Sequence, residues 1–223
     1  GTSGGARPKV MMEMDGEPWI IKFPAHVDRA DIGKMEYDYY LCAEQCGITM
    51  SECNLFPSDK CSGYFGTKRF DRKNQHGEME RVHMLTVAAL LELDFEQPVL
   101  DYQDLMKLTK IITNNSPEDL ENMYRRMCFN VYAHNRDDHA KNFSFLYEEE
   151  KKCWRLSPAY DLTYSTTYYG EHTTTVAGNG KNPGSKELIF VGTQAGLSKE
   201  KCRSIAVEIK NCVSDMLSEY LNP

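Results

Sequence analysis

The sequence lacks long apolar runs and has no excess of positive charge. No uninterrupted apolar stretch in its 223 residues approaches the roughly 18–20 residues that a membrane-spanning helix needs. We find no secretion signal either, so we expect a cytoplasmic protein. Its 26 lysine and arginine residues are outnumbered by 33 aspartate and glutamate residues, which gives a net charge of −7. This balance argues against direct binding of nucleic acid by this chain.

Regular cysteine spacing and internal repeats are absent as well. A chain of this length can form a large core, so we interpret its cysteines as reduced core thiols rather than a disulfide framework. The eight are Cys42, Cys46, Cys53, Cys61, Cys128, Cys153, Cys202 and Cys212.

A zinc site is the alternative for the first four cysteines, which lie close together in the sequence. Structural zinc sites favour two close pairs, and only Cys42 and Cys46 have such a spacing. Cys53 and Cys61 follow at wider intervals. Since positions i and i+4 also share one face of a helix, packing explains the first pair as well, and we favour packing.

The length favours one two-lobed domain, because 223 residues can bury roughly 70–75% of their unfolded surface. Apolar periodicity predicts helices over residues 82–93 and 102–112, and a final helix after Ser198. Alternation and turn residues predict a hairpin over residues 50–70. Residues 163–185 are rich in Thr, Gly, Asn and Tyr, so we interpret them as a mobile, substrate-facing segment; a disordered connection is the alternative.

Nine residues from His134 to Asn142 hold the most informative motif, which reads His-Asn-Arg-Asp-Asp-His-Ala-Lys-Asn. Asp137 and Asn142 have the spacing of a phosphotransferase catalytic loop. In such a loop the carboxylate orients an attacking hydroxyl and the amide oxygen reaches a Mg²⁺ ion. Asp161 lies downstream in Ser-Pro-Ala-Tyr-Asp-Leu, where an acidic residue can bridge the metal and the nucleotide phosphates.

The residues around this motif predict a helix before it and a hairpin after it. Ser116 followed by proline marks a helix start, and apolar positions then recur at helical spacing. Residues 143–147 and 153–156 alternate like two strands joined by a charged turn. In the alternative interpretation, the polar side chains only cap the helix and shape a turn. That alternative leaves Lys141 and the later Asp161 unexplained.

Two further motifs lie near the N-terminus. Residues 1–9 are Gly-rich, so their backbone N–H groups can approach phosphates closely, although a flexible tail is the alternative. Residues 18–23 form an apolar strand that carries Lys22, and a buried lysine is costly unless it is paired. Glu36 opens the next apolar helix and matches the lysine–glutamate ion pair of protein kinases. An exposed helix position is the alternative for Glu36.

Together these segments resemble the HipA family of bacterial serine/threonine kinases, best known as toxins of toxin–antitoxin modules. The resemblance rests on the Gly-rich start, WIIKFP, the KRFDR stretch at residues 68–72, HNRDDHAKN and SPAYDL. It implies an α+β, protein-kinase-like fold in a single domain over residues 1–223. A small mixed N-terminal lobe with a sheet would cover residues 1–80, and a larger all-helical C-terminal lobe would cover residues 81–223. ATP and Mg²⁺ would bind between the lobes.

The resemblance also implies roles at the catalytic loop. Asp137 is the implied catalytic base, and Asn142 and Asp161 are the implied Mg²⁺ ligands. His139 and Lys141 lie in the same loop, where they would stabilise charge on the moving phosphoryl group.

ATP binding is implied for residues of the small lobe and the hinge: Gly4, Gly5, Lys9, Lys22, Glu36, Lys68, Arg69 and Phe70. The hinge residues would hold the adenine chiefly through backbone groups. The family also carries an autophosphorylated hydroxyl on its Gly-rich loop, for which Thr2 and Ser3 are the two matching positions. A phosphate there would repel the phosphates of ATP.

Partners follow from the same resemblance. It implies a protein substrate, for example an aminoacyl-tRNA synthetase, and a HipB-like DNA-binding antitoxin. Family members carry a further N-terminal subdomain, so we expect either an excised domain or the compact, HipT-like kinase subunit of a split system with a small HipS-like partner. The alternatives are a small-molecule or lipid-headgroup kinase, an inactive pseudokinase that serves as a binding module, and a zinc-dependent interaction domain.

Overall fold

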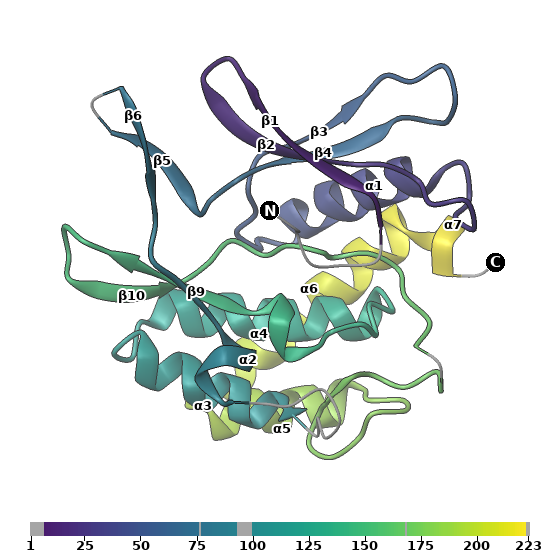
Figure 1. Ribbon diagram of the computed structural model, residues 1–223. Coiled ribbons are helices and arrows are strands. Elements are labelled where there is room, and N and C mark those ends of the chain that lie inside the picture. The colour runs from purple at the N-terminus through teal and green to yellow at the C-terminus, as the bar shows by residue number, and fades with distance from the viewer. Residues whose placement is uncertain (1–6, 76, 93–99, 168, 222–223) are drawn as a thin grey trace.

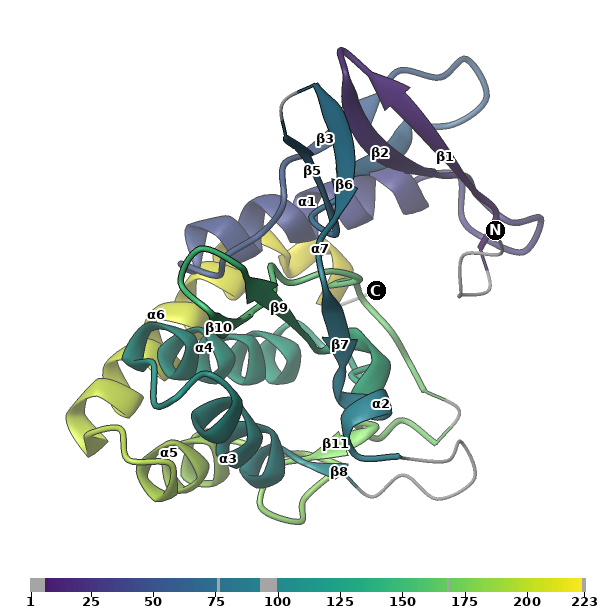
Figure 2. The same cartoon turned by 60° about the vertical axis from the view of Figure 1, so that its left-hand side comes forward.

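The structure is a computed structural model that describes residues 7–75, 77–92, 100–167 and 169–221. Its elements form two lobes, a small one built around a sheet and a larger one built around helices (Figures 1 and 2). The α+β class therefore agrees with the prediction.

A four-stranded antiparallel sheet forms the small lobe. Its strands lie in the order β1 (Lys9–Met14), β2 (Glu17–Lys22), β4 (Tyr64–Lys68) and β3 (Cys53–Phe56). Asp15 and Gly16 join β1 to β2 with φ angles of 53° and 76°. An Asp–Gly pair favours these angles in a two-residue hairpin, so the turn fixes the register that places Lys22 opposite Lys9.

Helix α1 (Ile32–Gln45) packs on this sheet and forms a small core with it, in which Tyr40 contacts Cys53 and Phe65. Gly33 lies so close to the loop between β3 and β4 that a Cβ atom there would be 2.2 Å from the Gly63 carbonyl oxygen. Only glycine permits this approach. The close packing holds the buried Glu36 of α1 beside the end of β2.

A hairpin and a second sheet connect the lobes. The hairpin consists of β5 (Arg72–Gln75) and β6 (Glu78–Arg81), and the second sheet has the order β10 (Cys153–Leu156), β9 (Ser144–Glu148) and β7 (Met84–Thr86). The predicted helix over residues 82–93 is wrong in its first part, because β7 pairs with β9 there; helix α2 covers only Val87–Leu90. Tertiary strand pairing thus overrides the local helical periodicity.

Helices dominate the larger lobe: α3 (Tyr102–Ile112), α4 (Pro117–Tyr132), α5 (Ser185–Gln194), α6 (Lys199–Met216) and α7 (Ser218–Leu221). The predicted start of α4 is confirmed, since the Ser116 hydroxyl accepts a hydrogen bond from the Asp119 amide at 3.3 Å. Helix α4 packs against α3 and α6. The larger lobe is not wholly helical, however, because it also contains β7, the predicted β9–β10 hairpin, and the parallel pair β8 (Leu100–Asp101) and β11 (Thr174–Thr175).

One hydrophobic core runs through both lobes, because α1 also packs on α6. Tyr39 of α1 is fully buried, and its ring lies 6.1 Å from that of Phe129 and 6.0 Å from that of Tyr220. Its hydroxyl donates a hydrogen bond of 2.7 Å to the Ala133 carbonyl. This anchor holds the small lobe in a defined position over the end of α4, where the loop that begins at His134 follows.

The interpretation of residues 163–185 as a mobile segment is wrong for residues 172–178, which are packed and bonded to the rest of the lobe. Thr174 and Val176 are completely buried, and β11 pairs with β8. Asp101 binds this segment further, since its carboxylate accepts hydrogen bonds from the Thr175 hydroxyl and the Gly178 amide. Polar composition suggested a loop, whereas the hydroxyls of Thr173 and Thr174 donate hydrogen bonds to the carbonyls of Arg136 and Asp138.

Within the described residues, no helix is long and apolar enough to cross a membrane.

Candidate active site

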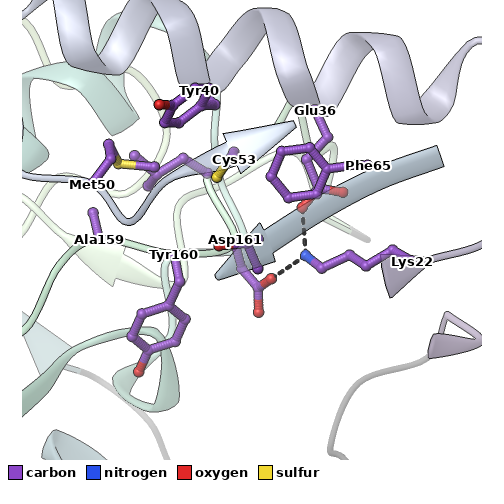
Figure 3. A pocket seen from close by; sticks show the side chains of 11 residues that line it. Lys22, Glu36, Tyr40, Met50, Cys53, Phe65, Ala159, Tyr160 and Asp161 are labelled. Atoms are coloured by element: carbon purple, nitrogen blue, oxygen red, sulfur yellow. Dashed lines mark hydrogen bonds and ion pairs between the residues drawn. The ribbon is translucent and has the colours of Figure 1, made fainter. Parts of the chain in front are cut away.

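Three charged side chains from distant parts of the chain meet between the lobes. The Lys22 ammonium at the end of β2 forms ion pairs with Glu36 of α1 and with Asp161, which follows β10 (Figure 3). Burial alone would lower the pKa of Lys22, but the carboxylates of Asp161 and Glu36 together raise it. Lys22 is therefore a fixed cation, and the pairing predicted for Lys22 and Glu36 is confirmed.

A small pocket surrounds these charges. Its walls come from the sheet and α1 on one side and from residues 159–162 on the other, with an apolar lining that includes Met50, Phe65 and Leu162 (Figure 3). The Lys22 ammonium lies 5.5 Å from the centroid of the Phe65 ring, within the range of a cation–π contact. Charge at the mouth and apolar side chains behind it are typical of a ligand pocket.

Asp161 has an unusual backbone conformation that its surroundings hold in place. Its φ angle is 54°, in the left-handed region, where aspartate is enriched but still uncommon. The preceding Tyr160 donates a hydrogen bond of 2.7 Å to the Lys141 carbonyl and also bonds Ser144. Since Lys141 belongs to the loop that begins at His134, these bonds fix Asp161 against that loop.

A buried arginine also anchors the chain just before Asp161. Arg126 of α4 is almost completely buried and donates hydrogen bonds to the Ser157 carbonyl and, at 3.0 Å, to the Asn122 side chain. Burial lowers the pKa of Arg126 to about 10, so the guanidinium remains charged at neutral pH. Hydrogen bonds to a charged donor are worth about 1.5–3 kcal/mol, which makes Arg126 a strong anchor for the chain before Asp161.

The outward side of the loop carries Asp137, His139 and Asn142. The Asp137 side chain is 60% exposed, and one of its oxygens lies 3.8 Å from Nε2 of His139. Desolvation raises the pKa of Asp137, as do the nearby Asp138 and Asp161, while His139 opposes this rise. Nδ2 of Asn142 donates a hydrogen bond of 2.8 Å to the Asp137 carbonyl, which leaves its Oδ1 as the ligand atom.

The inward side of the loop carries Asp138, whose carboxylate is completely buried. It accepts hydrogen bonds from the Tyr102 hydroxyl at 2.9 Å, from Nδ1 of His172 at 3.0 Å and from the Thr174 amide at 3.1 Å. Asn130 of α4 donates in turn to the Tyr102 hydroxyl at 2.8 Å. Because three donors satisfy one carboxylate, this network ties the loop to α3, to α4 and to the start of β11 with the residues before it.

Sequence reasoning missed the inward network. Tyr102 and Asn130 lie on helical faces and His172 lies in a Thr- and Gly-rich stretch, so none of them has a local motif around it. The one available signal was that two aspartates, Asp137 and Asp138, are adjacent. A catalytic loop needs only one outward carboxylate, so the second aspartate could point inward, where a buried carboxylate requires hydrogen-bond donors.

The expected hinge residues lie beside the pocket rather than in its lining. Lys68 pairs with Glu17 at 3.1 Å, and Arg69 binds Asp71 through two nitrogens, at 2.9 and 2.7 Å. The Phe70 ring lies 5.5 Å from the ring of Tyr160, next to Asp161.

The remaining expected residues lie in the Gly-rich region or in the loop. Lys9 in β1 contributes to lowering the pKa of Asp161, although Lys22 is the main cause. Lys141 contributes its carbonyl to the bond with Tyr160. Thr2, Ser3, Gly4 and Gly5 lie outside the described residues.

The donor set fits a hard divalent cation and a polyphosphate. The Asp161 side chain is 46% exposed, and Asn142 follows Lys141, whose carbonyl accepts the hydrogen bond from Tyr160, the residue before Asp161. Carboxylate and amide oxygens are the ligands that Mg²⁺ prefers, and Mg²⁺ sites on proteins commonly use one or two side chains together with substrate phosphates. Lys22 adds the fixed positive charge that phosphate oxygens need.

Known proteins resemble this chain in sequence and fold. A family model described as HipA-like C-terminal domain matches residues 1–216. The curated Sinorhizobium fredii protein named Putative kinase Y4dM is 28% identical over 175 residues, which cover 72% of this chain and 41% of that protein.

Two solved structures share the fold. HipA in the Shewanella oneidensis complex with HipB and operator DNA superposes with a TM-score of 0.76 at 17% identity, over 99% of this chain and 58% of that one. The Helicobacter pylori proinflammatory kinase CtkA superposes with a TM-score of 0.60 at 11% identity, over 94% and 91% of the two chains. This chain thus has a kinase-like α+β fold, and it spans less than two thirds of the length of Y4dM and HipA.

Proposed function

Because the chain belongs to the family of HipA-like C-terminal domains, we propose that it is an ATP- and Mg²⁺-dependent kinase that phosphorylates serine or threonine hydroxyls of a protein. One observation carries the proposal: Lys22, Glu36 and Asp161 meet at a pocket beside a loop that holds Asp137 and Asn142. Phosphoryl transfer depends on positioning and charge stabilisation, and these are the groups that provide both in kinases.

Each residue has a distinct task in this proposal. Lys22, held by Glu36, steadies the nucleotide phosphates, and Asp161 and Asn142 hold the metal ion. The bound metal ion would neutralise charge on the phosphates of ATP, the phosphoryl donor. Asp137 orients the acceptor hydroxyl and takes its proton.

Two residues assist at the reacting end of the loop. His139 lies 3.8 Å from Asp137 and lowers its pKa, so it favours the ionised carboxylate that a base requires. Together with Lys141, it can also stabilise charge on the phosphoryl group in transit.

A protein is the acceptor that the exposure of the loop favours. The Asp137 side chain is 60% exposed, so the hydroxyl of a large substrate can reach it without entering a closed cavity. A component of translation such as an aminoacyl-tRNA synthetase is the proposed substrate class. A HipB-like antitoxin is the proposed partner, by analogy with the Shewanella complex of HipA with HipB and operator DNA. A small HipS-like subunit is the proposed second partner.

The Gly-rich start completes the proposed nucleotide site. In this proposal, phosphates are bound by Gly4, Gly5 and Lys9, and the adenine end of the site is bordered by Lys68, Arg69 and Phe70. Autophosphorylation of Thr2 or Ser3 would place negative charge beside the phosphates of ATP and silence the kinase.

The test is incubation of the purified protein with Mg²⁺ and γ-labelled ATP, followed by intact mass measurement and peptide mapping. We expect a mass gain of one phosphate on Thr2 or Ser3 and label transfer to an added protein acceptor. Asp161→Ala should abolish both, whereas Asp59→Asn, in the exposed turn between β3 and β4, should change neither. Nucleotide binding without transfer would identify a pseudokinase, and a protein that does not bind ATP would overturn the proposal.

A further inference from the structure

Four sulfur atoms converge where α1 crosses α6. Cys42 lies on α1 and Cys46 caps its C-terminal end one turn later, and Cys212 and Met216 lie one turn apart on α6. The three thiol sulfurs all lie within 4.8 Å of one another, with 3.9 Å between Cys42 and Cys212, and the Met216 sulfur lies 3.7 Å from that of Cys212. Each helix thus presents an i, i+4 pair of sulfurs to the other.

These spacings match the ligand shell of a thiophilic metal ion. Zinc–thiolate bonds are about 2.3 Å long, so two thiolates of a tetrahedral site lie about 3.8 Å apart. The separation of Cys42 and Cys212 is close to that value, and all three cysteines are free thiols. Three thiols with a neighbouring thioether form a soft donor set, which selects Zn²⁺ or Cu⁺ over hard cations such as Mg²⁺.

The other cysteines lack this arrangement. The Cys53 thiol donates to the Ser51 carbonyl at 3.3 Å, and the Cys61 thiol donates to the Gly63 carbonyl at 3.5 Å. Within the part of the chain that the structure describes, no other cluster of three His, Cys, Asp or Glu ligand atoms has such geometry. Of the four cysteines considered for a zinc site from the sequence, Cys42 and Cys46 belong to this cluster and Cys53 and Cys61 do not; the third thiol, Cys212, comes from a helix near the C-terminus.

The cluster is also accessible from one side. Cys42 and Cys46 are completely buried, but Cys212 is only partly buried and Met216 is 40% exposed. An ion can therefore enter from the α6 side and meet the buried pair last.

We propose that Cys42, Cys46 and Cys212 bind one closed-shell thiophilic ion, Zn²⁺ or Cu⁺, which joins α1 to α6. Each thiol that ligates the ion releases its proton to solvent, and no oxidation is involved. The Met216 sulfur or a water molecule occupies the remaining position. Helix α1 belongs to the small lobe and carries Glu36, the partner of Lys22, whereas α6 belongs to the larger lobe. The bound ion therefore fixes the small lobe on the larger one.

The experiment uses the reduced protein, first freed of metal by a chelator under anaerobic conditions. One portion is loaded with ZnCl₂ and another with Cu⁺ supplied as its acetonitrile complex, and the bound metal is measured after desalting. We expect about one ion per chain and a higher melting temperature, because a ligand that binds only the folded state stabilises it. Loading with Co²⁺ should add a sulfur-to-cobalt charge-transfer band.

Variants separate the site from general effects of thiol loss. Cys212→Ser should weaken binding at least about tenfold, while the control Cys153→Ser, a partly buried thiol on β10, should bind as the parent does. Cys212 is chosen because its partial exposure makes unfolding of the variant less of a concern. Met216→Leu should weaken binding of Cu⁺ if the thioether ligates, and leave Zn²⁺ unaffected.

Either of two kinds of result would overturn the inference. The first is a binding result: bound metal below about a tenth of an ion per chain for both ions, or equal binding by Cys212→Ser and the parent. The second is thiol counting that finds Cys42 and Cys212 joined in a disulfide in protein kept free of oxidant. Neither readout depends on phosphoryl transfer, so failure here leaves the proposed kinase function untouched.

Discussion

Asp137 and Asp138 are neighbours in the chain, yet they occupy opposite environments. The Asp137 side chain is 60% exposed, with Nε2 of His139 3.8 Å away, whereas Asp138 is completely buried and accepts three hydrogen bonds. The two side chains have the same chemistry, so their surroundings alone separate their tasks. The outward carboxylate is available to a substrate, and the inward one is committed to holding the loop.

The same division extends to the residues around them. Asp161, Asn142 and Lys22 belong to the outward side, where the Asp161 side chain is 46% exposed and pairs with the largely buried Lys22. Tyr102 and His172 belong to the inward side, where every contact made with Asp138 satisfies a buried polar group. Substitutions on the two sides should therefore affect different quantities: catalytic rate on the outward side and stability on the inward side.

The largest effect is expected at Asp161. Asp161→Asn removes a charge from the proposed metal site and half of the negative charge that faces Lys22. Metal-ion stabilisation is worth several kcal/mol, so phosphoryl transfer should fall by about a thousandfold or more. The measurement is the single-turnover rate with labelled ATP, with circular dichroism as the control for folding. A rate within tenfold of the parent would place the metal site elsewhere.

The next effect is expected at Lys22. Lys22→Met keeps much of the side-chain volume but removes the cation that Glu36 and Asp161 hold. Loss of one such donor costs about 10²–10³ in rate. Kinetics at varied ATP concentration should show the loss, and Lys34→Met, on the exposed side of α1, is the matched control. Equal rates for the two variants would exclude Lys22 from the phosphate site.

On the inward side, Asp138→Asn should mainly reduce stability. The amide can accept on one side only, so its NH₂ group would face either the Thr174 amide or the donors Tyr102 and His172. Losing a hydrogen bond to a charged group costs about 1.5–3 kcal/mol of the free energy of unfolding. Urea unfolding measures this change, and Asp59→Asn is the exposed control. An unchanged midpoint would show that the buried network does not hold the loop.

The smallest effect concerns the pH dependence of activity. Desolvation raises the pKa of Asp137, so the rate should fall, as the pH decreases, at a pH above the ordinary aspartate pKa of about 3.9. His139 lowers the pKa of Asp137, and therefore His139→Gln should move the acid limb to higher pH, whatever its effect on the maximal rate. The pH profile of kcat/KM for the two proteins measures the shift. A limb that stays in place or moves to lower pH would contradict this coupling.

The sequence predicted the outward side well because its residues lie in compact motifs. Lys22, Glu36 and Asp161 were identified from a strand, a helix and a short segment, and the fold brings the three together. The division of the chain near residue 80 and the roles of the site residues remain predictions. The α+β class followed from the same motifs.

Other features depend on contacts that no local pattern encodes. The partners of Asp138 come from two distant segments, one at Tyr102 and one at residues 172–174, and Cys212 lies beside Cys42 only because α6 crosses α1. Residues 84–86 have helical periodicity but form a strand, because β9 offers an unpaired edge. In each case the structure depends on a residue or strand that is distant in the sequence, and the sequence alone does not identify that partner.

The most direct test of the account is the single-turnover rate of phosphoryl transfer by Asp137→Asn at saturating ATP and Mg²⁺. We predict that the rate falls by about 10²–10⁴-fold while ATP affinity and the urea midpoint stay unchanged. The reason is that the outward carboxylate acts on the acceptor hydroxyl and does not anchor the loop. A near-parental rate, or a loss of rate explained entirely by a loss of stability, would contradict it.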